Sequence, residues 1–441
     1  GDVYKRQLVK QYRAKYPHVL LVDSGDYFIG NPYVDDCEKR GEPLTILMNK
    51  LGYDVVTIGN HDLDYGQEAL RDHIKGMPST KFVITNANLS PTLENCFSPY
   101  VSIPIEGTSV SVGFIGLADL QTTDVRKMAG ISWTLPDEED YKGITDRFRL
   151  HHNTINVILS HLGYGNDLKM MKYSPNIDVI LGGHTHVMLP SGHLRTGTLL
   201  SHTGHSLSHV GVTEIIFSTE HPVSILSKST RAVSLNEEIP NDPEVKGIVR
   251  RFSGNPLFNQ QVGVAGEEIT HVTIGTLFCK VIQQASHSDI AIYNRGGVRS
   301  KNHLNKGPVT IRDIYELEPF REKIVTCSMS KADIEQLILS KFMSPTDDEG
   351  GILEVYCSGF SYQIMDGVTP SITSTLQNGV IYTVAMGDYL CSNFIFPQRG
   401  NGKPTGIDVR KALIDYLKQI KKLLNPPPSK LPIIRDTTFA L

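Results

Sequence analysis

The chain has 441 residues, a formal net charge of −4 at pH 7 and a pI near 6.5. This length exceeds one typical hydrophobic core, so we expect two domains. The mildly acidic balance offers no basic surface for a nucleic-acid backbone, and we expect no nucleic-acid partner. No apolar run approaches the ~20 residues that a membrane-spanning helix needs, so we expect no transmembrane segment.

The six cysteines are widely spaced and form no CxxC pair. This pattern predicts thiols rather than a zinc ribbon or a dense disulfide framework, and it leaves the compartment open. The cysteines are Cys37, Cys96, Cys279, Cys327, Cys357 and Cys391.

The start of the chain is unusual for a complete protein. Residues 1–7 contain no initiator Met and no apolar signal-peptide core. Residues Leu8–Tyr16 read as the middle of an amphipathic helix that leads into a strand. We therefore expect a fragment that lacks its first strand, with which a secretion signal could have been lost.

The first half alternates apolar runs with helical segments, which is typical of layered α/β folds. The predicted elements are a strand at Val19–Val22, a helix at Pro43–Leu51, a strand at Asp54–Ile58, a helix at Gln67–Lys75, and strands at Phe82–Thr85, Val110–Ile115, Ile155–Leu159, Val179–Leu181, Thr198–Leu200 and Val210–Phe217. Several of these strands end in polar residues, and those ends can converge in space.

A helix cap marks the best domain boundary. Asn241-Asp242-Pro243 is typical of a cap with proline in the first turn, and a helix is predicted at Glu244–Phe252. We predict a first domain at residues 1–238, a linker helix at 239–258 and a second domain at 259–441.

The second half has its own mixture of helices and strands. Helices are predicted at Thr276–Ala285, Lys331–Lys341 and Asp408–Leu417, and strands at Ile290–Tyr293, Ile324–Met329, Gly359–Ile364 and Ile381–Met386. The tail that contains Pro426-Pro427-Pro428 is expected to be extended.

The densest polar cluster follows the apolar run Val55–Ile58. It offers a metal ligand in Asn60, an acid or base in His61 and an orienting carboxylate in Asp64, with Asp62 between them. A polar turn that closes a strand is the alternative. Because ends of strands in α/β proteins build binding sites, four such residues so close together favour a site.

Four more clusters of this kind stand where strands are predicted to end. They are Asp23-Ser24-Gly25-Asp26, Ser160-His161-Leu162-Gly163, Gly182-Gly183-His184-Thr185-His186 and Ser201-His202-Thr203-Gly204. Any single histidine is more often structural or exposed. Repeated at strand ends, however, carboxylate, amide and imidazole groups form the mixed ligand set that borderline divalent ions prefer, and a two-metal site is the natural assembly.

The motifs DSGD, GNHDLDYG, SHLG and GGHTH, in this order, resemble the 5′-nucleotidase family of the calcineurin-like metallophosphoesterase superfamily. The resemblance implies an α/β fold, with a four-layer α/β/β/α metallophosphoesterase domain and a mixed α/β C-terminal domain. It also implies hydrolysis of nucleoside 5′-monophosphates by two divalent ions, such as Zn, Mn or Co. A periplasmic, extracellular or cell-surface location is implied as well.

The resemblance assigns the metal ligands. Asp26 would bridge the two ions, because a carboxylate has two oxygens and can neutralise both. Asn60, His161 and His184 would complete the second metal, and His186 would serve the first, where some relatives carry glutamine.

The resemblance also assigns the catalytic pair. His61, oriented by Asp64, would stabilise charge on the phosphoryl group or protonate the leaving oxygen. The family's first metal also takes an Asp-x-His motif from a first strand, and no such motif precedes Asp23. A complete chain would then lack two ligands, whereas a fragment would have lost them with its first strand.

Four residues of the second half resemble the family's substrate site. Asn294 would contact the base and Arg299 the phosphate or sugar, while Phe320 and Tyr389 would sandwich the base. A glycine turn with a surface arginine, and ordinary core aromatics, are the alternatives.

Two further motifs depart from the family. Its Gly-Gly-Asp-Gly after the second aromatic is replaced by Cys391-Ser392-Asn393, and an expected arginine appears as Thr270-His271. Alternative functions therefore include 2′,3′-cyclic nucleotide phosphodiesterase, nucleotide-sugar hydrolase and thiosulfate-ester hydrolase. A non-catalytic binding relative without a complete first metal site is a further alternative. The sequence does not indicate the oligomeric state.

Overall fold

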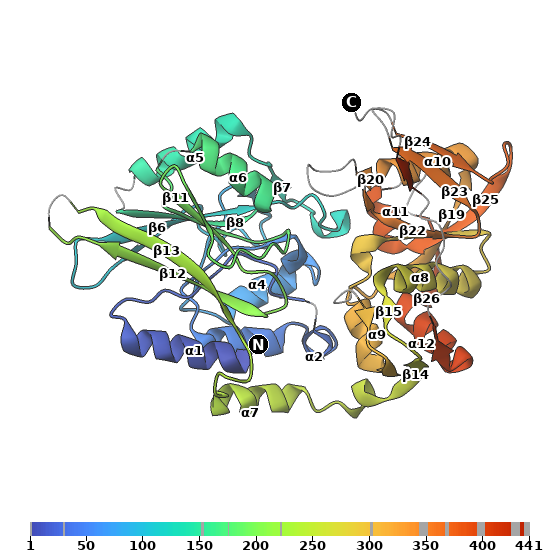
Figure 1. Cartoon of the computed structure of the whole chain (residues 1–441), viewed down its shortest axis with the longest axis horizontal. Helices are drawn as coiled ribbons and strands as arrows, with labels where there is room; N and C mark the ends of the chain where they lie inside the picture. The colour runs from blue at the N-terminus through green and yellow to red at the C-terminus, as the bar shows by residue number, and fades with distance from the viewer. Residues whose placement is uncertain are drawn as a thin grey trace. The chain divides into compact units, whose positions relative to one another are not determined.

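The computed structural model describes residues 2–29, 31–150, 154–174, 176–220, 223–299, 303–343, 352–366, 370–394, 402–424 and 433–435. The chain divides into two units (Figure 1). The first takes the residues up to Gly254 apart from 30–32, and the second takes that short stretch and the residues from Asn255 onward. Among the described residues, no helix combines the length and the apolar character that a bilayer crossing requires.

The first unit contains two sheets with largely parallel strands. The smaller sheet has the order β1 (Val22–Asp23), β2 (Val55–Val56), β3 (Lys81–Phe82). The larger sheet has the order β10 (His193–Arg195), β11 (Thr198–His202), β9 (Val179–Gly182), β8 (Ile155–His161), β6 (Ser111–Ala118), β5 (Val101–Pro104). In the larger sheet, the edge strands β5 and β10 pair antiparallel to their neighbours.

Helices cover the sheets of the first unit. They are α1 (Asp2–Lys15), α3 (Glu42–Leu51), α4 (Gln67–Lys75), α5 (Glu138–Leu150), α6 (Tyr164–Tyr173) and α7 (Pro243–Phe252). A separate antiparallel ribbon is formed by β12 (His209–Phe217) and β13 (Ile225–Ser234), which Figure 1 shows in yellow-green.

Alternation along the strands explains how these elements are layered. Val55 packs in one core cluster with Val157 of the larger sheet, whereas its neighbour Val56 packs with Leu70 of α4. Ile158, next to Val157, points instead to a cluster that includes side chains of α5 and α6. Each sheet therefore has one face on the other sheet and one on helices, which gives the four-layer α/β/β/α arrangement predicted from the resemblance.

Several predicted strands of the first unit are shorter than expected. The apolar runs at Val19–Val22, Asp54–Ile58 and Phe82–Thr85 overlap the strands β1, β2 and β3, each of which is only two residues long. Ile58 is fully buried although it lies outside β2. Burial, rather than strand pairing, explains why residues just after β2 and β3, such as Ile58 and Ile84, are apolar.

The second unit is built on a five-stranded mixed sheet. Its order is β22 (Val355–Ser358), β16 (Ile290–Asn294), β25 (Ile381–Gly387), β19 (Lys323–Ser330), β26 (Lys403–Asp408). The helices of this unit include α8 (His271–Ser286), α9 (Ile311–Leu317), α10 (Lys331–Ser340), α11 (Asp388–Phe394) and α12 (Val409–Ile420). Both units are thus mixed α/β structures, as predicted.

Caps fix two helix starts in the second unit. The Ser330 hydroxyl oxygen accepts the backbone N–H of Asp333, and the backbone N–H of Ser330 donates to the Asp333 carboxylate. This capping box starts α10 at Lys331. Thr310 and Asp313 form the same box before α9. The short helix α11 was not predicted, and the expected proline tail at residues 426–428 lies outside the described residues.

Candidate functional site

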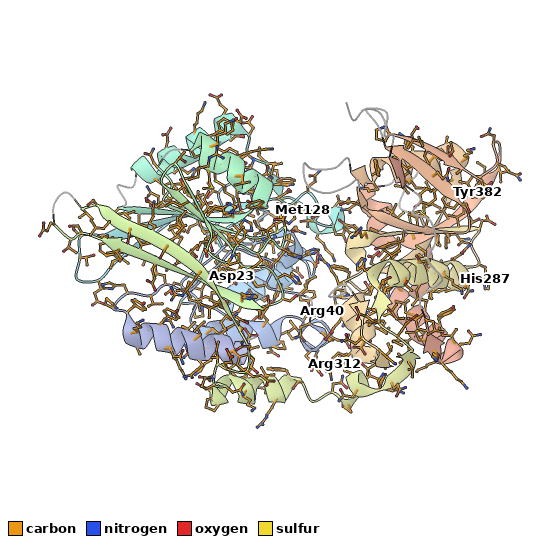
Figure 2. The ribbon with its side chains drawn as sticks, viewed as in Figure 1. Asp23, Arg40, Met128, His287, Arg312 and Tyr382 are labelled. Atoms are coloured by element: carbon orange, nitrogen blue, oxygen red, sulfur yellow. The ribbon has the colours of Figure 1, made fainter. Side chains whose placement is uncertain are left out.

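Asp26 stands in a tight turn after β1. Asp23, labelled in Figure 2, accepts the N–H of Gly25 at 3.1 Å. Gly25 has a φ of +94°, and a side chain there would come within 2.3 Å of the Gly59 nitrogen. Asp26 itself has a φ of +60°, a left-handed conformation that costs energy for any residue with a Cβ. The turn is therefore strained at the predicted bridging ligand and depends on glycine for its close packing.

The Asp62 carboxylate holds this turn against the loop after β2. Its two oxygens accept the N–H groups of Asp26 at 2.8 Å, Tyr27 at 3.2 Å, Phe28 at 3.1 Å and Gly59 at 2.7 Å. Asp62 is fully buried. Four N–H donors on one carboxylate fix the relative position of the two motifs.

His161, at the end of β8, presents one ring nitrogen to Asp26. Its Nδ1 lies 2.7 Å from the carbonyl oxygen of Ser24, so Nδ1 carries a proton and donates it. Its Nε2 lies 3.0 Å from Asp26 Oδ2 but makes no hydrogen bond, although the side chain is almost fully buried. Burial lowers the pKa of His161, but the Asp26 carboxylate outweighs it and raises the pKa to about 9. The Asp26 carboxylate therefore stabilises a positive charge at the position of His161 Nε2.

His184 and Asn60 complete the cluster. His184 follows β9 with a φ of +72°, and its Nδ1 lies 3.1 Å from the side-chain oxygen of Asn60. The rings of His161 and His184 are 5.1 Å apart between centroids. Donor atoms of Asp26, His161 and His184 all lie within 4.8 Å of one another. The structure thus brings together four of the five predicted metal ligands.

The fit of this cluster to a divalent ion rests on its donors. A buried imidazole nitrogen without a hydrogen bond, a carboxylate and an amide oxygen are the ligands that such ions take. Placing the donors close together without a cation leaves carboxylate and imidazole lone pairs facing each other. These residues therefore fit a metal, and the fold implies divalent metal ions.

His186 stands apart from the ligand cluster. It is exposed, has a φ of +60°, and its ring lies 5.0 Å from the ring of His205. Within the part of the chain that the structure describes, the group of possible metal donors comprises Asp26, His161 and His184, without His186. Its predicted role at the first metal stays a prediction.

His61 and Asp64 form the predicted pair. His61 Nδ1 lies 2.8 Å from Asp64 Oδ2, and both side chains are mostly buried, with 21% and 16% exposed. The two residues are three positions apart in the sequence, and the single 3₁₀ turn Asn60–Leu63 brings their side chains together. The His61 N–H donates to Asp26 Oδ1 at 2.8 Å, which ties the pair to the metal cluster. This geometry allows His61 to exchange a proton at Nε2 while Asp64 fixes its ring.

The four predicted substrate residues belong to the second unit. Asn294 ends β16, Phe320 precedes β19, and Tyr389 is the second residue of α11, which directly follows β25. Ile324 of β19 pairs with Gly387 of β25, and β16 runs parallel to β25. Asn294, Phe320 and Tyr389 therefore stand at the same end of the five-stranded sheet.

Two of these residues form a direct contact. The Arg299 guanidinium lies 5.3 Å from the centre of the Phe320 ring, and the Arg299 N–H donates to the Leu317 carbonyl at 2.7 Å. A cation over a ring holds both side chains in place. Asn294 has a buried side-chain oxygen without a hydrogen bond, beneath a Gly297 whose Cβ would come within 2.9 Å of the Asn294 amide.

Comparison with known proteins agrees with this geometry. A family model described as calcineurin-like phosphoesterase matches residues 4–188, and one described as 5′-nucleotidase, C-terminal domain, matches residues 253–394. The chain belongs to the 5′-nucleotidase family of calcineurin-like metallophosphoesterases. The resemblance predicted from the sequence is confirmed.

Three relatives illustrate the reach of the similarity. The trifunctional nucleotide phosphoesterase YfkN of Bacillus subtilis is 24% identical, over 78% of this chain and 26% of its own length. The snake venom 5′-nucleotidase of Crotalus adamanteus is 23% identical over 73% of this chain and 61% of its own. The solved 5′-nucleotidase precursor from Thermus thermophilus has a TM-score of 0.86 at 22% identity, covering 99% of this chain and 94% of that one. The chain thus spans less than two thirds of the first two relatives.

One group in this 5′-nucleotidase-family chain was missed by the sequence analysis. Asp167 of α6 accepts a hydrogen bond from Ser160 Oγ at 2.5 Å and lies 2.7 Å from His202 Nε2. Ser160 Oγ in turn accepts the N–H of Leu162 at 3.2 Å. His202, which the sequence analysis places in a cluster at a strand end, is buried in this network, with 1% of its side chain exposed.

The network touches both strands that lead to the histidines of the donor cluster. Ser160 directly precedes His161, and a Cβ on Gly182, two residues before His184, would come within 2.0 Å of His202 and 2.4 Å of Asp167. Only glycine fits there, so the buried pair lies against both strand ends. The spacing of Ser160 and Asp167 carries no recognised motif, and only the position of His202 at a strand end gave a signal.

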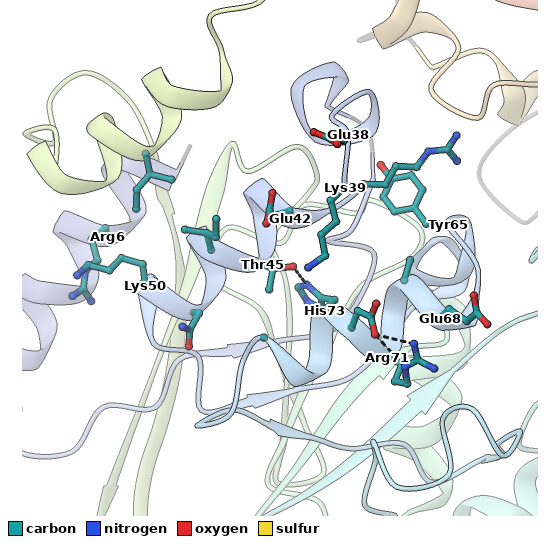
Figure 3. A pocket seen from close by; sticks show the side chains of 17 residues that line it. Arg6, Glu38, Lys39, Glu42, Thr45, Lys50, Tyr65, Glu68, Arg71 and His73 are labelled. Carbon is teal, nitrogen blue, oxygen red and sulfur yellow. Dashed lines mark hydrogen bonds and ion pairs between the residues drawn. The ribbon is translucent and has the colours of Figure 1, made fainter.

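A polar pocket of about 940 Å³ is lined by residues of α3, α4 and neighbouring segments (Figure 3). It is lined mainly by charged side chains, among them Arg6, Glu38, Lys39, Glu42, Lys50, Glu68 and Arg71. His73 lines it too, with its Nδ1 2.7 Å from Thr45 Oγ1. Mixed charges of both signs give this pocket no clear ligand preference.

Proposed function

We propose that this chain hydrolyses phosphate esters, with nucleoside 5′-monophosphates as its substrates and nucleoside and phosphate as products. The observation that carries the proposal is the cluster of Asp26, His161 and His184 donors beside the His61–Asp64 pair. Family membership supports the same chemistry. The whole activity is a proposal because the chain covers only part of its relatives.

We assign the metal ligands as follows. Asp26 would bridge two divalent ions, with Asn60, His161 and His184 on one ion and His186 on the other. Zn, Mn or Co would suit these nitrogen and oxygen donors. When bound, such ions supply Lewis-acid charge for the phosphoryl oxygens and activate water for in-line attack.

The chain's own residues then manage the proton. Asp64 holds Nδ1 of His61 at 2.8 Å, which leaves Nε2 of His61 as its exchangeable position. A proton at Nε2 would stabilise charge on the phosphoryl group or pass to the leaving oxygen. No covalent nucleophile is needed.

In the second unit, we assign recognition of the nucleoside to Phe320, Tyr389, Asn294 and Arg299. The buried, unpartnered oxygen of Asn294 supports a role in binding a polar ligand group. The contact of Arg299 with Phe320 supports a ring held ready for stacking rather than a free cation. A periplasmic, extracellular or cell-surface location is proposed on the same family grounds, and a venom enzyme among the relatives supports it.

The test is phosphate release from adenosine 5′-monophosphate and from a base-free ester, ribose 5-phosphate, with Mn, Co or Zn added. Phe320→Ala should raise the KM for the nucleotide about five- to tenfold, because stacking on one aromatic face is worth ~1 kcal/mol. The KM for ribose 5-phosphate should change much less, because this ester has no base to stack on Phe320. Tyr416→Ala is the matched control, since a lysine also stands over the Tyr416 ring.

The outcome also separates the alternatives. A substrate panel with 2′,3′-cyclic nucleotides, nucleotide sugars and thiosulfate esters would reveal those activities if they exceed monophosphate hydrolysis. Nucleotide binding with no phosphate release under any metal would overturn the proposal in favour of a non-catalytic binding protein. Equal effects of Phe320→Ala on both esters would contradict the stacking role.

A further inference from the structure

Two cysteines of the second unit stand with their sulfur atoms in contact. Cys327 lies within β19 and Cys391 within α11, 64 positions later, and their Sγ atoms are 3.5 Å apart. Neither is in a disulfide in this structure. A disulfide places the sulfurs about 2.05 Å apart, so a small rotation or shift would join them.

The surroundings of the pair favour a specific contact. Cys391 is buried in the core cluster of the second unit, and Cys327 packs against the same cluster while partly exposed. Gly402 faces both sulfurs: a Cβ there would come within 2.9 Å of Cys391 Sγ and 3.0 Å of Cys327 Sγ. With a φ of +69°, Gly402 adopts a conformation that favours glycine, and it leaves room for the two sulfurs.

We infer that Cys327 and Cys391 form a reversible disulfide that tethers α11 to β19 and thereby alters nucleotide binding. The link to nucleotide binding rests on the proposed function, because it depends on the assigned role of Tyr389. Cys391 follows Tyr389 by two positions on the same short helix. It also occupies the stretch in which the sequence departs from its family's glycine-rich motif.

The oxidant is a small-molecule disulfide such as oxidised glutathione. The thiolate of the partly exposed Cys327 attacks one sulfur of the glutathione disulfide, which releases one glutathione thiolate and leaves a mixed disulfide on Cys327. The Cys391 thiolate then attacks Cys327 Sγ and releases the second glutathione. Two protein thiols are oxidised, one glutathione disulfide is reduced to two thiols, and the two protons pass to the released thiolates.

The consequence reaches Tyr389 through α11. The helix begins at Asp388, whose carboxylate accepts the N–H of Lys323 in β19 at 3.1 Å. Closing the gap between the sulfurs adds a second, covalent tie between the same two elements. Because Tyr389 lies between these ties, the disulfide changes its freedom to pack against a base.

The first experiment detects the bond without measuring activity. The full chain is incubated with oxidised glutathione, unreacted thiols are alkylated, and the digest is analysed by mass spectrometry. We expect a peptide pair joined through Cys327 and Cys391, which dithiothreitol separates. Cys391→Ala should instead trap glutathione on Cys327, and Cys96→Ser should leave the cross-link intact. Full alkylation of both cysteines, or a glutathione on each without a cross-link, would overturn the inference.

The second experiment measures the effect on binding. Oxidation should raise the KM for adenosine 5′-monophosphate about threefold or more, since misplacing a contact by about 1 Å is costly, and should leave the KM for ribose 5-phosphate unchanged. Cys327→Ser should show no change on oxidation. An unchanged nucleotide KM in fully cross-linked protein would overturn the coupling to Tyr389. If the chain hydrolyses neither ester, the proposed function fails, whereas the mass-spectrometric result still decides whether the disulfide forms.

Discussion

Asp62 accepts the backbone N–H of Asp26 at 2.8 Å, although the two residues are 36 positions apart. The same carboxylate oxygen accepts the N–H of Gly59 at 2.7 Å. The turn that carries the proposed bridging ligand and the loop that carries Asn60 and His61 are therefore joined at one buried carboxylate. This relationship makes Asp62 a structural residue of the site, not a ligand.

Asp62→Asn should destabilise the first unit by roughly 3 kcal/mol. The NH₂ group of the new asparagine would face backbone N–H groups that now donate to the Asp62 carboxylate, in a buried site. Urea unfolding followed by tryptophan fluorescence measures the loss, since Trp133 is the only tryptophan and belongs to this unit. Asp72→Asn is the control, because Asp72 is exposed and pairs with the neighbouring Arg71. A loss as small as that of the control would contradict the role of Asp62.

Asp26→Ala should remove metal binding and turnover together. Asp26 contributes donor atoms beside His161 and His184, and its loss leaves two imidazoles without a carboxylate to neutralise the ions. We expect kcat to fall about 10²–10³-fold or more. Metal content by elemental analysis and phosphate release are the measurements, with Asp178→Asn, at a partly buried partner of Lys228 outside the donor cluster, as the control. Full metal content in the variant would refute Asp26 as a ligand.

The sequence predicted the residues of the donor cluster but not the residues that hold them in place. Asp26, Asn60, His161 and His184 were recognisable because parallel strands carry their final residues to one edge, so the order of motifs along the chain translates into proximity. Asp62 and Asp167 act through backbone N–H groups and a distant histidine. Such partners follow from the loop conformation, for which the sequence has no periodic signal.

The second unit shows the same limit. The ends of β16, β19 and β25 explain why Asn294, Phe320 and Tyr389 stand at one sheet end. In the sequence, Asn294 and Tyr389 follow predicted strands and Phe320 precedes one. The sequence could not place the Arg299 guanidinium over Phe320. The direction of that side chain depends on the backbone conformation of the glycine-rich loop, and glycine allows many conformations.

Asp167→Asn should weaken metal binding about 10- to 100-fold while the chain stays folded. The change removes the charge that pairs with His202 and weakens the hydrogen bond from Ser160, the residue before His161. Metal titration followed by calorimetry measures the affinity, and urea unfolding checks the fold. The single variant His202→Gln keeps a hydrogen-bond donor near Asp167 and should retain most of the wild-type metal affinity. Unchanged metal affinity in Asp167→Asn would show that the network only packs the core.

His61→Ala should lower kcat about 10²–10⁴-fold with little change in metal content. The His61 ring pairs with Asp64, whereas its backbone N–H donates to Asp26, so removing the ring leaves the Asp26 hydrogen bond intact. Asp64→Asn should have a smaller effect in the same direction, because the ring of His61 remains. Loss of bound metal in His61→Ala, found by elemental analysis, would instead identify His61 as a ligand.

His73 should make the first unit less stable in mild acid. The hydroxyl hydrogen of Thr45 goes to the Gly41 carbonyl at 3.0 Å, so His73 Nδ1, 2.7 Å from Thr45 Oγ1, is the donor of that hydrogen bond. Its Nε2 is buried without a partner, and the ring lies among Tyr27 and Phe28. Burial lowers the pKa of His73 from 6.5 to about 4. The folded chain therefore keeps this ring neutral.

The sign of the effect follows from proton binding. Between pH 6.5 and about 4, the unfolded chain protonates His73 but the folded chain does not. Stability contributed by this ring therefore falls as pH drops through that window, by roughly 3 kcal/mol in all, and is constant above it. The free energy of unfolding, measured with urea, should change with pH differently in the wild type and in His73→Asn, which retains a donor to Thr45. This difference should appear only within the window. His18→Gln, at an exposed histidine, should keep the wild-type pH dependence of the unfolding free energy. If His73→Asn also kept the wild-type pH dependence, His73 would become protonated in the folded chain.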